Sequence, residues 1–230
     1  MRFYEKHRPR RLSEIVGQPP VRVLQRIAHA PYACCVLLEG GAGTGKTSAA
    51  YALAHELGCF SPDTWPKDNP PAGAWANCTG LFTVIGSELS IERARELFGN
   101  TLRLRWGSSS GFVVLVIEEL ERISKECQVF LKVQLESKLP HNVIVVATSN
   151  DSGALSKALL QRFRRYQFNG DLGFLQASVN RLRMIWQVEA PPDLPFPDSA
   201  ATWGWDDQTK DYSLRSALDA MQDYLELACV

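Results

Sequence analysis

One short stretch of this chain constrains its fold more than any other feature of the sequence. Residues 40–47 fit the pattern G-x-x-x-x-G-K-[ST], in which glycines let backbone N–H groups turn inward around phosphate oxygens. A following helix adds partial positive charge, while Lys46 would reach the β- and γ-phosphates and Thr47 would offer its hydroxyl to Mg²⁺. The octet therefore predicts a nucleoside triphosphate site. Its predicted ligand-binding residues are Gly40, Gly41, Ala42, Gly43, Thr44, Gly45, Lys46 and Thr47.

The segments around this octet alternate between strand and helix patterns. Continuous apolar, β-branched runs suit strands of a parallel sheet that helices cover on both faces. The alternation predicts an α/β fold, a P-loop parallel sheet flanked by helices. We expect strands at 34–38, 112–117 and 143–147 and helices at 47–54, 91–98 and 128–135, with an irregular, proline-rich excursion at 60–75.

The strand pattern stops after Phe168, and a different organisation follows. A helix is expected over 174–188, a proline-rich break follows it, and a last helix should begin near Tyr212 or Ser213. The tail is therefore predicted to be a small all-helical lid domain. The predicted division places the nucleotide-binding domain at 1–168 and the lid domain at 169–230.

Composition excludes several classes of protein. The 25 basic and 25 acidic side chains cancel, so the chain as a whole has no field that would hold DNA unaided. No apolar run approaches the roughly 20 residues that span a bilayer, and the amino terminus lacks a secretory pattern, so a cytoplasmic protein without membrane contact is expected. Six cysteines without a C-x-x-C pair favour core or surface thiols over a zinc site.

Charge is nevertheless unevenly distributed along the chain. Residues 2–11 are rich in arginine, and residues 193–226 are rich in carboxylates. A basic start and an acidic end suggest head-to-tail contact with a neighbouring subunit. Two solvated faces explain the same pattern.

Two carboxylates stand at the end of the predicted strand 112–117. P-loop enzymes place there the acids that hold the magnesium shell and orient the attacking water. Glu118 is therefore predicted on the metal side, and Glu119 as the general base. Two solvated carboxylates that end a strand are the alternative interpretation.

The stretch from Phe112 to Glu136 resembles the ATPase subunits of DNA sliding-clamp loaders, which are AAA+ proteins. An apolar strand, Glu118-Glu119-Leu120-Glu121 and a helix ending in Leu135-Glu136 follow the family's strand, D-E-A-D motif and helix without a gap. The family has aspartate where this chain has Glu118. The extra methylene would push the carboxylate about 1 Å toward the metal shell, which predicts weak magnesium binding or slow hydrolysis.

Three further positions match catalytic residues of this family. Asn150, after the next strand, resembles the polar sensor of the γ-phosphate, and Arg162 falls on the arginine finger that acts on the next subunit's ATP. Arg215 matches the second sensor, on a lid helix. Around Arg162 the chain departs from the family at Lys157, Gln161 and Phe163. A surface arginine is the alternative for both arginines.

The amino terminus contains another stretch that resembles a motif of this family. The run from Tyr4 to Gln18 resembles E-K-Y-R-P…L-x-[ED]-[IV]-V-G-Q, which packs beside the adenine in clamp-loader subunits. The resemblance makes Arg8, Pro9 and Val16 the adenine-side candidates. A basic amino-terminal arm is the alternative interpretation.

The resemblance runs from Tyr4 to Gln222 and implies an ATPase that binds ATP and Mg²⁺. Such a subunit would act as an oligomeric switch in DNA replication or repair, with other AAA+ subunits, a sliding clamp and primed DNA as partners. The chain ends at Val230, before the family's helical collar domain would follow. We therefore expect either a truncated chain or assembly through the ATPase faces or with another subunit.

Two other functions stay open on the sequence alone. DNA-remodelling AAA+ motors of the branch-migration or replication-maintenance type share the R-P…L-x-E-x-x-G-Q opening, although the phrase at 6–9 and the context of Arg162 favour a clamp loader. A nucleotide-binding interaction subunit with little turnover is motivated by Glu118 and the missing collar. DNA-contact candidates are Arg93, Arg95 and Lys132, which solvated helix faces explain equally well.

Overall fold

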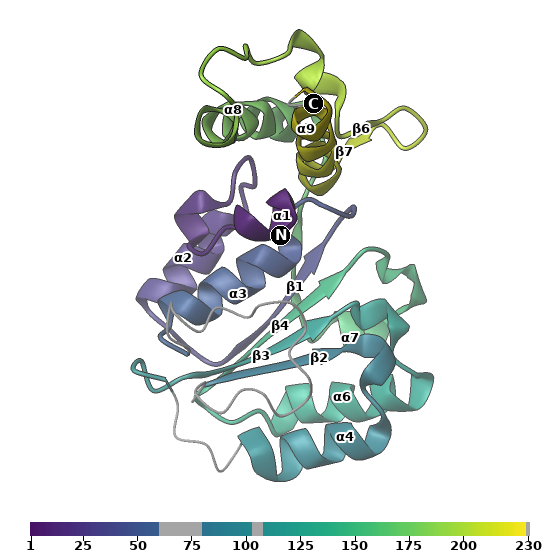
Figure 1. The fold of residues 1–230 in the computed structure, drawn as a ribbon. Helices are drawn as coiled ribbons and strands as arrows, with labels where there is room; N and C mark the ends of the chain where they lie inside the picture. The colour runs from purple at the N-terminus through teal and green to yellow at the C-terminus, as the bar shows by residue number, and fades with distance from the viewer. Residues whose placement is uncertain (60–79, 103–107, 229–230) are drawn as a thin grey trace.

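The computed structural model describes residues 1–59, 80–102 and 108–228. The expected excursion at 60–75, Cys78 and Cys229 lie outside these residues. At the centre is a five-stranded parallel sheet with the strand order β2-β3-β4-β1-β5 (Figure 1). Its strands are β1 Cys34–Glu39, β2 Leu81–Ile85, β3 Val113–Glu118, β4 Val143–Ser149 and β5 Arg164–Gln167. The predicted P-loop parallel sheet is therefore confirmed.

Helices cover both faces of this sheet, as the buried strands require. Helices α2 and α3 lie over one face, and α4 and α6 lie over the other (Figure 1). A π-helical turn, Leu97–Thr101, continues α4. The helices are α1 Phe3–Lys6, α2 Val21–His29, α3 Lys46–Glu56, α4 Ile91–Glu96, α6 Lys125–Ser137, α7 Lys157–Leu160, α8 Leu172–Glu189 and α9 Leu214–Ala228.

Strand β1 shows how the sequence sets the two layers. Successive side chains of a strand point to opposite faces of the sheet. Cys34 accordingly packs into the core beneath α2 and α3, while Cys35 packs into the core beneath α4 and α6. Cys59 and Cys127 are also buried.

The carboxyl-terminal region forms a third hydrophobic cluster around α8 and α9. Helix α8 starts at an N-cap, where Asp171 accepts a hydrogen bond from the backbone N–H of Phe174 at 3.0 Å. Trp186 and Met221 are buried between the two helices. The predicted helical tail is confirmed, and it also contains a short antiparallel hairpin, β6 Trp205–Asp206 and β7 Asp211–Tyr212. We call the segment 170–228 the lid; a domain boundary at 168/169 stays a prediction.

The amino terminus packs against the lid, and Phe3 bonds to a residue 219 positions further along the sequence. Phe3 and Tyr4 join the hydrophobic cluster of α8 and α9, and α1 lies directly beneath them (Figure 1). The backbone N–H of Phe3 donates to Gln222 at 2.9 Å, and Arg2 pairs with Asp223 at 3.7 Å. The basic start therefore meets the acidic end within one chain, which satisfies part of the charge asymmetry without a neighbour.

Among the helices that the structure describes, none combines the length and the apolar character that crossing a lipid bilayer requires.

Candidate nucleotide-binding site

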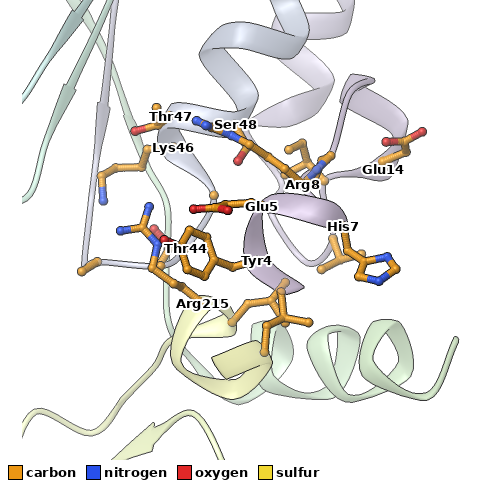
Figure 2. Close-up of a pocket in the computed structure, with 18 of the residues that line it drawn as sticks. Tyr4, Glu5, His7, Arg8, Glu14, Thr44, Lys46, Thr47, Ser48 and Arg215 are labelled. Atoms are coloured by element: carbon orange, nitrogen blue, oxygen red, sulfur yellow. The ribbon is translucent and has the colours of Figure 1, made fainter. Parts of the chain in front are cut away.

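A cavity of about 650 Å³ lies where the P-loop, the strand ends, the amino terminus and the lid meet (Figure 2). Parallel strands bring their carboxyl ends to one edge of the sheet, and binding sites of α/β folds form there. The structure brings most of the predicted residues to this cavity. Those that line it are Arg8, Pro9, Val16, Ala42, Gly43, Thr44, Gly45, Lys46, Thr47, Glu118, Glu119, Asn150 and Arg215.

Lys46 begins α3 and is only 7% exposed. Its ammonium donates to the carbonyl oxygens of Gly40 at 2.7 Å and Gly41 at 2.6 Å. Burial lowers the pKa of Lys46 to about 8, because desolvation disfavours the charged form, and the carboxylate of Glu121 opposes this shift. The charge of this buried ammonium is balanced here by the dipoles of two neutral carbonyls, and an anion bound beside it would stabilise the charge further.

Two glycines of the P-loop have backbone positions that a side chain would not fit. Gly40 has φ +141°, and an added Cβ would collide with the carbonyl oxygen of Phe168. Gly43 has φ +75°, and its Cβ would collide with the hydroxyl of Ser213 on the lid. Glycine tolerates both constraints. The bare cradle and the buried ammonium together fit a polyphosphate.

Glu118 ends β3 and lines the cavity, but its carboxylate already has a partner. Its Oε1 accepts a hydrogen bond from the hydroxyl of Tyr51, a residue of α3, at 2.7 Å. Nothing in the sequence indicated this contact, because the two residues are 67 positions apart.

Glu119 has an uncommon backbone conformation, with φ 53° and ψ 51°. Residues other than glycine adopt this left-handed region at a cost, and such residues cluster at functional sites. Its backbone N–H donates to the hydroxyl of Thr148 at 3.3 Å, which fixes it to the neighbouring strand β4. Its carboxylate forms an ion pair with Arg122 at 3.0 Å.

Asn150 directly follows β4 and lines the same cavity. Its backbone N–H donates to Glu121 at 3.1 Å, so the loop after β3 holds the loop after β4. Asn150 thus lines the same cavity as Glu118 and Glu119, as expected from adjacent parallel strands.

The lid and the amino terminus place two arginines at the cavity, each beside an aromatic ring. The guanidinium carbon of Arg215, in the first turn of α9, lies 5.5 Å from the ring centroid of Tyr4 (Figure 2). That of Arg8 lies 5.2 Å from the ring centroid of Tyr51. The lid also contacts the P-loop directly, since the backbone N–H of Leu214 donates to the carbonyl of Gly43 at 3.3 Å.

Three predicted residues do not line the cavity. Gly40 and Gly41 lie just behind it and present their carbonyls to Lys46. Arg162 lies elsewhere on the surface, where its guanidinium donates to Glu136 at 2.6 Å. At this position Arg162 does not line the cavity of its own chain, and its role as an arginine finger stays a prediction.

The DNA-contact candidates lie on the outer helices α4 and α6, away from this cavity. Arg93 pairs with Glu96 of its own helix at 2.7 Å. Arg95 lines a shallow groove between α4 and α6.

Two residues of the site were not predicted from the sequence. These are Tyr4, which lines the cavity, and Tyr51, which is the hydrogen-bond partner of Glu118.

The sequence model of the "ATPase family associated with various cellular activities (AAA)" matches residues 36–171. This range holds the P-loop, both acids, Asn150 and Arg162, and it covers more than half of the chain. The chain belongs to the AAA family of ATPases.

Several of the relatives that this chain resembles are replication proteins. The replication factor C small subunit of Thermoplasma volcanium is 29% identical over 71% of this chain and 48% of its own length. That of Methanoculleus marisnigri is 32% identical over 59% of this chain and 38% of its own. DNA polymerase III subunit gamma of Buchnera aphidicola is 26% identical, over 81% and 53%. The predicted clamp-loader-like resemblance is confirmed, and the chain spans about half the length of these relatives.

Solved structures agree on the fold. The RuvB Holliday junction branch migration motor of Thermotoga maritima superimposes with a TM-score of 0.65 at 22% identity, over 97% of this chain and 67% of that one. At this identity the likeness shows the α/β fold with its helical lid, and nothing more specific.

Proposed function

We propose that this chain binds ATP with Mg²⁺ in the cavity and hydrolyses it. The observation that carries the proposal is the buried ammonium of Lys46, held by loop carbonyls within a glycine cradle that opens on two carboxylates and an arginine. Lys46 would bind the β- and γ-phosphates, and Thr47 and Glu118 would hold the ion, which supplies charge neutralisation at the phosphates. Arg8, Pro9 and Val16 would lie beside the adenine.

Glu119 would orient a water molecule and take its proton, and Asn150 and Arg215 would contact the γ-phosphate side. Two features support slow turnover. The side chain of Glu118 is one methylene longer than the aspartate of the clamp-loader motif, and the carboxylate of Glu119 forms an ion pair with Arg122. This ion pair must open before Glu119 can take a proton from a water molecule.

Hydrolysis of ATP in the presence and absence of primed DNA tests this proposal. We expect a slow, DNA-stimulated rate. Glu119→Gln should lower it at least a hundredfold without weakening ATP binding, because loss of a general base costs about 10²–10⁴-fold. The exposed Glu126→Gln is the matched control. Tight ATP binding with a rate that Glu119→Gln leaves unchanged would favour a low-turnover interaction subunit.

We further propose that the chain acts in the cytoplasm as a clamp-loader-like oligomeric switch in DNA replication or repair. Other AAA+ subunits, a sliding clamp and primed DNA are its proposed partners. The position of Arg162 on the surface, outside its own cavity, supports a role as arginine finger for a neighbour. Light scattering with ATP and Mg²⁺ should detect assembly at micromolar concentration. A monomer under all conditions, with or without DNA, would contradict the oligomer.

The second candidate function is a DNA-remodelling motor, because motors of this type share the opening R-P…L-x-E-x-x-G-Q with residues 8–18 of this chain. The two candidates differ in the DNA that should stimulate hydrolysis. A clamp-loader-like subunit should respond more strongly to a primed template than to a four-way junction, and a branch-migration motor should show the opposite preference.

A further inference from the structure

We propose that Tyr51 is a positioning residue for the metal-side carboxylate Glu118. This inference rests on the proposed function, because it concerns the ion that accompanies the nucleotide. Tyr51 lies on α3, one and a half turns after Lys46, and its hydroxyl donates to Glu118 Oε1 at 2.7 Å. One carboxylate oxygen is thereby fixed, which leaves Oε2 for the hydration shell of an ion.

Glutamate needs such a partner more than aspartate does. Its extra methylene adds a rotatable bond, so a free glutamate side chain loses more conformational entropy when it is ordered at an ion. The hydrogen bond from Tyr51 orders Glu118 before the ion arrives. Pre-ordering of this kind lowers the entropic cost of binding.

The tyrosine is itself held firmly. Tyr51 is 6% exposed, and its hydroxyl also has Thr83 of β2 as a hydrogen-bond partner. The hydroxyl is therefore held between a residue of β2 and the carboxylate at the end of β3.

The ring of Tyr51 has a second contact, with the other side of the cavity. The guanidinium of Arg8, an adenine-side candidate, lies 5.2 Å from the ring centroid. Cation–π contacts have this geometry. One side chain thus touches both the residue proposed to hold the ion and a residue proposed to lie beside the base.

The test is the Mg²⁺ dependence of ATP binding by the whole chain, measured with a fluorescent ATP analogue. Tyr51→Phe keeps the ring and its contact with Arg8 and removes only the hydroxyl. We expect affinity in EDTA to change less than twofold, while the Mg²⁺ concentration for half-maximal enhancement rises about tenfold, as loss of a hydrogen bond to a charged group predicts. Tyr32→Phe, which removes an exposed hydroxyl near β5, is the matched control.

A double-mutant cycle separates positioning from a general structural effect. Glu118→Gln should weaken the Mg²⁺ response by itself, and adding Tyr51→Phe to it should change nothing further, since the two residues act as one unit. Additive effects, or a Tyr51→Phe variant with the Mg²⁺ dependence of the wild type, would overturn the inference and leave the proposed function standing. A wild-type chain that binds no ATP at all would overturn both.

Discussion

Two walls of the nucleotide cavity differ in what holds them in place. The floor consists of the P-loop and the ends of β3 and β4, and the roof consists of Tyr4, Arg8 and Arg215. Hydrogen bonds from Lys46 to loop carbonyls and from Glu119 to Thr148 fix the floor to the buried sheet. In the roof, the solvent-exposed guanidinium of Arg215 lies against the ring of Tyr4 in a cation–π contact.

This difference suggests that the floor and the roof of the cavity have different functions. Exposed cation–π contacts contribute only about 0.5–1 kcal/mol, so a bound nucleotide can displace them easily. The floor is formed before the nucleotide arrives and should determine whether it binds. The roof should determine how the lid responds, because α9 carries Arg215 and also bonds to Gly43 of the P-loop.

The largest effect on binding should come from the floor. Lys46→Ala removes the ammonium and should weaken ATP binding about a hundredfold or more, because two or more charge-assisted hydrogen bonds to phosphate are lost. Isothermal titration calorimetry measures the affinity, and Lys138→Ala, an exposed lysine at the end of α6, is the matched control. An affinity of Lys46→Ala for ATP within threefold of the wild type would show that Lys46 does not contribute to phosphate binding as proposed.

The pH dependence of binding should also originate in the floor. The pKa of Lys46 is about 8 without ligand, and phosphate oxygens would raise it. Above pH 8, ATP binding should therefore take up a proton, and affinity should fall by up to about tenfold per pH unit. Calorimetry at pH 9 in two buffers of different ionisation enthalpy measures this uptake. Lys46→Arg should abolish it, and uptake that persists in this variant would assign it to another group.

The same shift has a consequence for the stability of the free chain. Because the folded pKa of Lys46 is depressed from 10.5 to about 8, the unfolded chain binds more protons between these values. The contribution of this residue to the free energy of unfolding should therefore rise with pH from about 8 to about 10.5. Urea titrations of the wild type and of Lys46→Met across this range compare the two slopes.

A smaller effect should follow from a change in the roof. Arg215→Ala should weaken ATP binding only about fivefold, because an exposed arginine loses little by truncation compared with a buried one. It should, however, reduce the change in tryptophan fluorescence that reports on the lid, where Trp186 and Trp203 lie. Arg22→Ala on α2 is the control. A loss of binding as large as that of Lys46→Ala would remove the distinction between the walls.

The smallest effect should come from the contact between the amino terminus and the lid. Glu189 of α8 pairs with Lys6 at 2.7 Å and with His7 at 2.9 Å. Glu189→Gln should lower the free energy of unfolding by about 1 kcal/mol or less, with a shift in Tm of roughly 2–4 °C. The exposed pair of Asp207 and Lys210 provides the control Asp207→Asn, which should change the free energy of unfolding less. A shift larger for the control would contradict this account.

The floor was predictable from the sequence because its chemistry is local. The P-loop is one continuous octet, and the acids and Asn150 directly follow apolar runs that read as buried strands. Strand β5 was not predicted, because Arg164–Gln167 is a polar edge strand without a hydrophobic pattern. Helix α2 was not predicted either, although Leu24 and Ile27 are buried.

The roof could be predicted only in part. Arg8 and Arg215 were identified by resemblance to clamp-loader motifs, and both line the cavity. Their aromatic partners were missed, since contacts between residues far apart in sequence leave no periodic signal. Tyr51 was expected only as a helix residue. Its hydrogen bond to Glu118 depends on how α3 packs against β3, which the three-dimensional structure alone reveals.

The central claim is that a preformed floor makes this cavity a site for ATP. Calorimetric titration of the whole chain with ATP, in Mg²⁺ and in EDTA, tests it most directly. The account predicts saturable binding of one ATP per chain, tighter with Mg²⁺ and lost in Lys46→Ala. Absence of binding at millimolar ATP, or binding that Lys46→Ala leaves unchanged, would contradict it.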